Sequence, residues 1–356
     1  MSKKYNFYAG PAILPMDVMK KAQEEFLNFN GIGLSVVEIS HRSKDYVNVI
    51  ETAEAKIRSL LGVPDNYSVL FIQGGASLQF GMIPMNLLQG GKADYVNTGA
   101  WAKKAIKEAK LFGDVNIAGS SEDKNFNYIP ETVLSNDATY VHVTSNETIG
   151  GIQYKTFPDT GDIPLVVDMS SDIFCRPLDV SKFGIIYCGA QKNMGPSGVT
   201  LVIMRNDLID NATQGLTSML SYKTHRDAGS MYNTPPTFSI YIVKLVMELL
   251  EKNGGLEAME KTNVAKAKIL YDAIDGLSLY NGTANVDDRS LMNVTFRLTN
   301  EELEAKFIKE GAAKGLMGLK GHRSVGGCRA SIYNAMPTEG VEELVRFMEK
   351  FEKDNK

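Results

Sequence analysis

The feature that most limits the fold is an alternation of short apolar runs with longer amphipathic segments between residues 44 and about 250. Residues 68–73 (SVLFIQ) are almost wholly apolar, which is typical of a strand covered on both faces. Residues 44–62 instead place apolar side chains at helical spacing and end at Gly62, a favourable helix terminus. Further apolar runs lie at 139–144, 164–170, 184–189 and 199–204. This pattern predicts an α/β fold with a mainly parallel sheet and helices on both faces.

The last hundred residues follow a different pattern. Pro235 and Pro236 are expected in the first turn of a helix that stops at Gly254. Beyond about residue 260 the order becomes helix, strand, helix, strand and helix, which indicates a smaller α+β domain. We therefore expect a large domain at 16–258 and a small domain formed by 1–15 and 259–356.

Composition excludes several classes of protein. The chain has 356 residues, a net charge of −4 and no basic stripe, which argues against nucleic-acid binding. The most apolar helical stretch, 238–250, contains Lys244 and Glu248 and is too short to span a bilayer. The N-terminus lacks the long apolar stretch of a signal peptide. Three cysteines, none at metal-like spacing, indicate a reducing compartment. We expect a cytoplasmic protein with no metal, membrane or nucleic-acid partner.

One candidate anion site follows the strand at 68–73. Gly74-Gly75-Ala76-Ser77 leads directly into a helix, where free backbone N–H groups and the helix dipole favour an anion. A double-glycine turn of this kind serves plain packing about as often. The chain has no G-x-G-x-x-G and no Walker lysine, which counts against a nucleotide site.

Three further residues follow strands or begin helices at the same predicted sheet edge. Asp168 ends an apolar run, where a carboxylate needs a partner; it is either a cap or ion-pair residue or the counter-charge of a cationic heterocycle. Trp101, alone, is either core or a stacking surface. Lys192 ends the next apolar run and is either a solvated loop residue or a reactive amine. Together they match pyridoxal phosphate, which needs a lysine for a Schiff base and a carboxylate at its ring nitrogen.

The sequence resembles the phosphoserine aminotransferase family, which belongs to the class V aminotransferases of pyridoxal-phosphate fold type I. The resemblance rests on NFYAGPAILP (6–15), SHRSK (40–44), FIQGGAS (71–77), NTGAWA (97–102), SNETIGGI (145–152), VVDMSSDI (166–173), GAQKNMGPSGV (189–199), YNTPPTFSIY (232–241) and GHRSVGGCRASIYNA (321–335). It covers nearly the whole chain. It implies transamination between glutamate and 3-phosphohydroxypyruvate in serine biosynthesis, and allows a phosphorylated hydroxythreonine substrate in pyridoxine biosynthesis.

The resemblance also implies roles for individual residues. Lys192 would hold the cofactor and move the substrate proton, while Asp168 would pair with the ring nitrogen. The other implied cofactor contacts are Ala76, Ser77, Trp101, Thr148 and Gln191, with Asn233 and Thr234 reaching from the second subunit of a homodimer. The implied substrate contacts are Arg329 for the α-carboxylate and His41, Arg42, His322 and Arg323 for the distal anion. Some family members carry arginine or cysteine where this chain has Ser77.

Two alternatives come from different classes. A cysteine desulfurase of the same fold would use Cys328 as nucleophile, but this residue directly precedes Arg329 in a predicted strand and should point away from it. A non-catalytic pyridoxal-phosphate-binding homologue would not require Lys192, Asp168 and Arg329 together. Of the remaining histidines, we expect His142 in the core and the His225-Arg226 pair on the surface.

Overall fold

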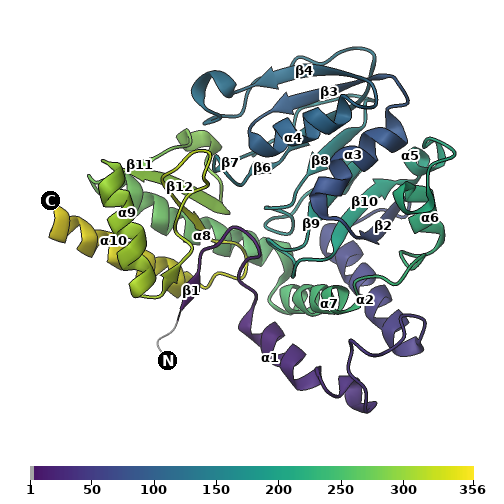
Figure 1. Cartoon of the computed structure of the whole chain (residues 1–356), viewed down its shortest axis with the longest axis horizontal. Helices are drawn as coiled ribbons and strands as arrows, with labels where there is room; N and C mark the ends of the chain where they lie inside the picture. Colours follow the sequence, from purple (N-terminus) through teal and green to yellow (C-terminus); the bar gives the residue numbers. More distant parts are fainter. Residues whose placement is uncertain (1–3) are drawn as a thin grey trace.

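A seven-stranded sheet forms the centre of the larger part of the computed structural model, which describes residues 4–356 (Figure 1). The strand order is β2-β10-β9-β8-β5-β3-β4. The strands are β2 (Tyr67–Ile72), β3 (Lys92–Asn97), β4 (Asp114–Ser120), β5 (Ala138–Thr144), β8 (Leu165–Asp168), β9 (Ile185–Gly189) and β10 (Thr200–Arg205). All neighbours pair in parallel except β10, which is antiparallel to β9 and β2. The predicted mainly parallel sheet is confirmed.

Helices cover both faces of this sheet, as predicted. The helices of this part are α1 (Met16–Glu25), α2 (Lys44–Leu61), α3 (Gly75–Leu87), α4 (Ala100–Ala109), α5 (Asn206–Asp210), α6 (Tyr222–Asp227) and α7 (Thr237–Lys252). Because side chains alternate along a strand, β2 faces two cores. Val69 and Phe71 join the core under α2 and α7, whereas Leu70 and Ile72 join the core under α3 and α4. Both faces of β2 are therefore dry, which explains its apolar sequence.

The C-terminal part has its own antiparallel sheet and its own core. Strands β11 (Tyr280–Gly282), β12 (Asn293–Leu298) and β14 (Cys328–Ser331) pair in that order. Helices α8 (Gly255–Gly276), α9 (Glu301–Ala313) and α10 (Thr338–Asn355) pack around them, and β1 (Tyr5–Asn6) pairs with β13 (Leu316–Met317). We infer from the separate core that this part, with the N-terminal residues, is a domain. Residues 1–3 of the expected domain lie outside the described residues.

Helix α8 passes from one core to the other. Leu256 in its first turn belongs to the core of the larger part, while Leu270 and Ile274 belong to the C-terminal core. The domain boundary expected after residue 258 therefore falls inside a continuous helix.

Two buried donors fix the middle of α8. The Asn263 side-chain amide donates to the carbonyl of Cys175 at 3.0 Å. The Lys266 amine donates to the carbonyls of Tyr333 (2.7 Å) and Met336 (3.0 Å), and its pKa is lowered to about 7 by burial. Both parts of the chain are thus bonded to the same two turns of α8.

The structure of the larger part differs from the sequence prediction in the start of α7 and in the presence of β4. Helix α7 begins at Thr237, after both prolines, because a residue before proline is disfavoured from helical geometry and Pro236 itself has ψ 77°. The edge strand β4 was not expected, since its sequence is polar and much of it is exposed. A short hairpin, β6 (Asn146–Glu147) and β7 (Ile152–Gln153), lies beside the main sheet.

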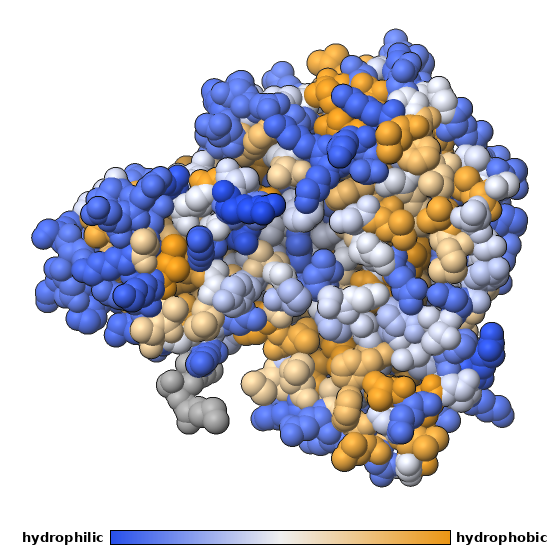
Figure 2. All heavy atoms as spheres, in the orientation of Figure 1, coloured by the Kyte–Doolittle hydropathy of each residue, from blue (hydrophilic) through white to orange (hydrophobic). Residues whose placement is uncertain are grey.

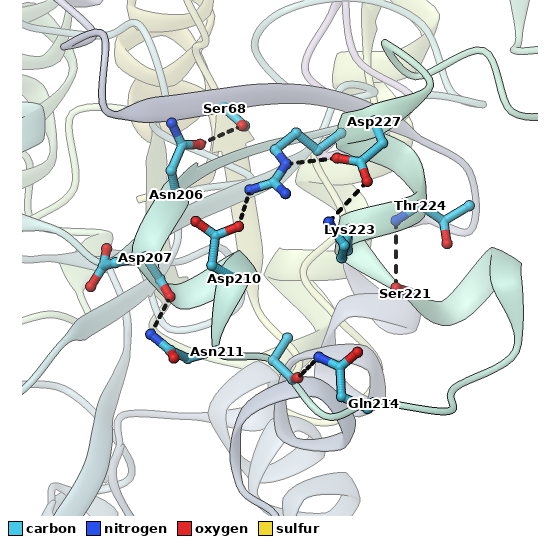
Figure 3. Close-up of polar contacts among 12 residues, drawn as sticks. Ser68, Asn206, Asp207, Asp210, Asn211, Gln214, Ser221, Lys223, Thr224 and Asp227 are labelled. Carbon is cyan, nitrogen blue, oxygen red and sulfur yellow. Dashed lines mark hydrogen bonds and ion pairs between the residues drawn. The ribbon is translucent and has the colours of Figure 1, made fainter.

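The segment after β10 is held by its own polar side chains (Figure 3). Arg226 forms ion pairs with Asp210 (2.7 Å) and Asp227 (3.0 Å), and Lys223 pairs with Asp227 (3.1 Å). His225 is buried, and its Nε2 lies 3.0 Å from the carbonyl of Met219. The expectation that the His225-Arg226 pair is a surface feature is therefore wrong for the histidine. His142 is buried against Tyr187, as expected.

Candidate active site

The loop that carries Lys192 follows β9 at the carboxyl edge of the parallel strands, where open α/β sheets bind ligands. Backbone and side chains fix the loop on both sides of the lysine. The Ala12 N–H donates to the carbonyl of Gln191 at 2.9 Å, and the Asn334 N–H donates to the Asn193 side-chain oxygen at 2.9 Å. The lysine is thus held in one place by residues from both ends of the chain.

The amine of Lys192 faces three of the predicted site residues. Nζ donates to the Thr148 hydroxyl at 2.5 Å and lies 5.1 Å from the centre of the Trp101 ring. Burial lowers the pKa of Lys192 to about 8, although the nearby carboxylate of Asp168 opposes the shift. Part of the amine is therefore neutral close to pH 7, as a nucleophile or base requires.

Asp168 is the last residue of β8, and one of its carboxylate oxygens is free. Oδ1 accepts hydrogen bonds from the Ser170 N–H (2.9 Å) and the Ser170 hydroxyl (2.6 Å). Within residues 4–356 no hydrogen bond is formed to Oδ2. Burial raises the pKa of this carboxyl group, while Lys192 and the Ser170 hydrogen bonds oppose the rise. A buried carboxylate with one free oxygen fits a ligand N–H cation.

Trp101 lies in the first turn of α4. Its indole Nε1 is buried and has no hydrogen-bond partner among the described residues. Lys104 places its amine 4.1 Å from the ring centre. An aromatic face near Lys192 with an unsatisfied indole N–H is consistent with a ligand-stacking residue.

The start of α3 offers the expected anion site. The preceding residue, Gly74, has φ 96° and no capping side chain, and a Cβ there would lie 2.6 Å from Leu78. Ala76 and the exposed Ser77 lie in the first turn, whose backbone N–H groups have no helical partners. Gln191 directly precedes Lys192 in the sequence, and no hydrogen bond between described residues joins it to Ser77.

Asn233 and Thr234 are exposed and lie beside Gln73 of the same chain. The Asn233 amide donates to the Gln73 side-chain oxygen at 3.3 Å, and the Gln73 amide donates to the Thr234 carbonyl at 3.4 Å. Gln73 directly precedes the glycine turn at the start of α3. The pair is thus tied to this turn through its own chain's Gln73.

Arg329, on β14, is an arginine without a carboxylate partner. Its Nη1 donates to the carbonyl of Thr148 at 3.3 Å, whereas its buried Nε has no partner. Within residues 4–356 no Asp or Glu lies within 4.0 Å of its guanidinium, and burial lowers its pKa. Arg329 and His322 line one cavity of about 480 Å³. A free, part-buried guanidinium is suited to a ligand carboxylate.

The two predicted His–Arg pairs lie on separate loops. His41 and Arg42 precede α2. Nε2 of His41 is buried and has no hydrogen-bond partner among residues 4–356, and Arg42 is exposed. His322 shares a 2.7 Å hydrogen bond with the Ser324 hydroxyl, and its pKa is lowered by burial and by Arg329. No hydrogen bond or ion pair between described residues joins either pair to Lys192. His322 nevertheless lines the same cavity as Arg329.

Two residues near the site were not predicted. Ser170 orients Asp168, and the spacing of aspartate and serine two residues apart is a turn signal that could have revealed it. Glu147 is buried next to Thr148, but in sequence it looks like a solvated loop residue.

Pyridoxal phosphate fits the groups that the structure leaves without partners. A ring between Trp101 and Asp168 would meet the free Asp168 oxygen, with Lys192 as its amine and the start of α3 for its phosphate. Among residues 4–356 no group of His, Cys, Asp and Glu could hold a metal ion. Cys328 is buried in the C-terminal core, and burial raises the pKa of its thiol, so it is no accessible nucleophile.

Comparisons with known proteins agree with this geometry. The aminotransferase class-V family model matches residues 4–344. Phosphoserine aminotransferase from Desulfosudis oleivorans is 59% identical over 100% of both chains. The structure of the Bacillus circulans phosphoserine aminotransferase is 53% identical over 99% of both chains, with a TM-score of 0.97. A pyridoxal-phosphate-bound phosphoserine aminotransferase from Trichomonas vaginalis is 39% identical, with a TM-score of 0.93 over 98% of this chain and 100% of the other. The chain belongs to the class V aminotransferases and, within them, to the phosphoserine aminotransferase family.

Proposed function

We propose that the protein is a phosphoserine aminotransferase that uses pyridoxal phosphate to transfer an amino group from glutamate to 3-phosphohydroxypyruvate. The product would be O-phospho-L-serine, an intermediate of serine biosynthesis. One observation carries the proposal: an amine of lowered pKa (Lys192) and an unpaired guanidinium (Arg329) meet at Thr148, with the Trp101 ring and the buried carboxylate of Asp168 near the amine. These are the groups that hold a cationic ring and an amino acid's carboxylate.

The residues that would bind the cofactor are those whose polar groups lack hydrogen-bond partners among residues 4–356. When bound, pyridoxal phosphate supplies a ring that withdraws electrons from the substrate's Cα. Asp168 would keep the ring nitrogen protonated, since a carboxylate that is buried beside a cation stabilises the charged form. Trp101 would cover one face of the ring. Backbone N–H groups at Ala76 and Ser77 would bind the phosphate, with Gln191 as a further contact.

Lys192 would act as the base. In its neutral form Nζ can take the proton from the substrate's Cα and return it to the other side of the transferred nitrogen. Thr148 holds that amine now through its hydroxyl and would orient it during the reaction. The lowered pKa provides the neutral form near pH 7.

The substrate would be bound at both ends. Arg329 would clamp the α-carboxylate, because a guanidinium matches a carboxylate with two parallel hydrogen bonds. His41, Arg42, His322 and Arg323 would bind the distal anion, either the carboxylate of glutamate or the phosphate of phosphoserine. A phosphorylated hydroxythreonine presents the same two anions and is a candidate second substrate.

We further infer a homodimer with composite sites. Figure 2 shows apolar side chains gathered along the lower edge of the molecule, over α1 and the loop that follows it. The exposed apolar residues there include Met16, Phe26, Leu27, Ile32, Leu34 and Val37. A patch of this kind supports burial against a second copy of the chain. Asn233 and Thr234, exposed at the rim, would then complete the phosphate site of the partner.

The compartment is inferred from cysteine chemistry. Cys175, Cys188 and Cys328 are all unpaired thiols, which supports a reducing compartment such as the cytoplasm. Separately, none of the helices within residues 4–356 has both the length and the apolar character to cross a membrane.

The proposal is tested by assaying the purified protein with phosphoserine and 2-oxoglutarate, with and without added pyridoxal phosphate. We expect cofactor-dependent formation of glutamate. Cysteine as substrate should give no sulfide, because the Cys328 thiol is buried. Sulfide formation, or cofactor binding without any amino-group transfer, would contradict the assignment.

A further inference from the structure

Helix α4, which carries Trp101, begins without a cap of its own. The residue at the cap position is Gly99, with φ +155°, and no side chain caps the helix locally. A helix start leaves backbone N–H groups without helical partners, and a side-chain oxygen normally satisfies one of them. At Gly99 there is no room for such a side chain, because a Cβ would lie 2.6 Å from the carboxyl carbon of Glu147.

Glu147 supplies the missing oxygen from another part of the chain. Its Oε1 accepts the N–H of Ala102 at 3.1 Å across a sequence separation of 45 residues. The side chain is 1% exposed, and its Oε2 is buried without any hydrogen-bond partner within residues 4–356. A carboxylate is costly in such a place unless it is stabilised by the helix N-terminus.

The same strand joins this cap to the lysine. Glu147 ends β6, and the next residue, Thr148, accepts the hydrogen bond from Lys192 and gives its carbonyl to Arg329. Two adjacent residues therefore contact the lysine on one side and the tryptophan's helix on the other. Figure 1 shows β6 beside the start of α4.

We propose that Glu147 is a positioning residue that caps α4 from outside and so holds Trp101 against the cofactor ring. The inference rests on the proposed function for its statement about the ring, but the cap itself does not. The role is indirect: Glu147 contacts the start of α4 and acts through the helix that Trp101 belongs to.

The charge on Glu147 is consistent with this role. Burial raises its pKa to about 7; the hydrogen bond from the Ala102 N–H and the charge of Lys192 oppose the rise, and the charge of Asp168 adds to it. Both the acid and the carboxylate keep an oxygen that accepts the Ala102 hydrogen bond. Capping therefore depends on the acceptor atom, and a glutamine can provide one.

The test uses Trp101 as its own reporter, since it is the only tryptophan of the chain. The emission spectrum of the cofactor-free protein reports the tryptophan's surroundings. Quenching of this emission by added pyridoxal phosphate gives the dissociation constant. The variants are Glu147→Ala, which removes the acceptor, Glu147→Gln, which keeps it, and Glu108→Ala as a control that removes a carboxylate near the other end of α4.

We expect Glu147→Ala to shift the emission of the cofactor-free protein and to raise the cofactor dissociation constant about tenfold. This factor corresponds to about 1.4 kcal/mol, a stability loss within the usual range for a helix cap, expressed in cofactor binding. Glu147→Gln should stay within about twofold of the wild type, as should Glu108→Ala. If Glu147→Ala does not fold, Glu147→Asp is used, because its side chain is one methylene too short to reach Ala102; the same changes are expected of it.

Two results would overturn the inference. One is a Glu147→Ala protein whose emission and dissociation constant match those of Glu108→Ala. The other is an equal defect in Glu147→Gln, which would show that charge and not the accepting atom matters. The cofactor-free emission tests the cap whatever reaction the enzyme performs, whereas the transamination assay tests the proposed function alone.

Discussion

Two regions of the molecule treat their charged side chains in opposite ways. In the segment after β10, Arg226 and Lys223 are saturated by Asp210 and Asp227 (Figure 3). At the carboxyl edge of the sheet, among residues 4–356, the Lys192 amine forms a hydrogen bond only to a hydroxyl, and the Arg329 guanidinium only to a backbone carbonyl. Charges that are satisfied within the chain stabilise the fold, whereas charges left open are available to a ligand. A His–Arg dipeptide in the sequence does not by itself show whether its arginine is paired within the chain or free to bind a ligand.

The largest effect that separates the two regions is expected for their lysines. Lys192→Ala should lower kcat by about 10²–10⁴-fold, because the base that moves the Cα proton is lost. Lys223→Ala should leave kcat unchanged, since its exposed amine only pairs with Asp227. Transamination of phosphoserine measures both. Near-native turnover in Lys192→Ala would refute the role of this lysine.

The arginines give the next largest contrast. Arg329→Ala should lower kcat/KM for glutamate and phosphoserine alike by about ten- to a hundred-fold, which corresponds to a charge-assisted contact of about 1.5–3 kcal/mol. Arg226→Ala should keep native kcat/KM and lower only the melting temperature slightly, since surface ion pairs contribute little. If Arg226→Ala also reduced kcat/KM, the division between satisfied and open charges would fail.

The expected effect of Arg42→Ala depends on the substrate. Phosphoserine should lose more in kcat/KM than glutamate, because a phosphate carries more charge than a carboxylate, and alanine should be spared. The three values of kcat/KM are measured side by side. Equal losses on all three substrates would mean that Arg42 does not contact the distal anion.

The smallest expected effect is on stability. The pKa of Lys192 is lowered in the folded protein, to about 8 from 10.5, so the folded chain binds this proton more weakly than the unfolded chain. The lysine therefore destabilises the cofactor-free fold below about pH 8, and the penalty disappears as the pH rises towards 10.5. Cofactor-free Lys192→Met should melt a few degrees above the wild type at pH 7, with the gap closing by pH 10. Thermal melting at both pH values measures it, and a constant gap would contradict the assignment.

Sequence predicted most of this fold because its strands are buried on both faces. Val69 and Leu70 face different cores, so β2 is apolar throughout and easily found. The edge strand β4 was missed because its sequence is polar and only one of its seven residues is buried. The direction of β10 leaves no trace in its composition, since a central strand is apolar whichever way it runs.

Site residues could be predicted where they directly follow an apolar strand. Residues that are buried by packing between distant segments could not. Asp168 and Lys192 stand directly after apolar runs, and the structure places both at the expected edge. Glu147 and His225 were missed as buried groups, because the partner of each is a backbone group that the local sequence does not indicate. Glu147 accepts the Ala102 N–H, 45 residues away, and the His225 ring lies against the Met219 carbonyl. No local pattern encodes such partners.

The continuous course of α8 has a mechanical consequence. Helix α8 packs into both cores, and the buried hydrogen bonds of Asn263 and Lys266 hold its middle in place. We therefore expect it to connect the two parts rigidly and not to serve as a hinge. Swinging the C-terminal part outward together with α8 would break the buried hydrogen bond from Asn263 to Cys175, at about 1–3 kcal/mol. We therefore expect the distance between Arg329 and Lys192 to stay constant throughout turnover. A substrate then fits only if the distance between its carboxylate and its reacting carbon matches this constant separation.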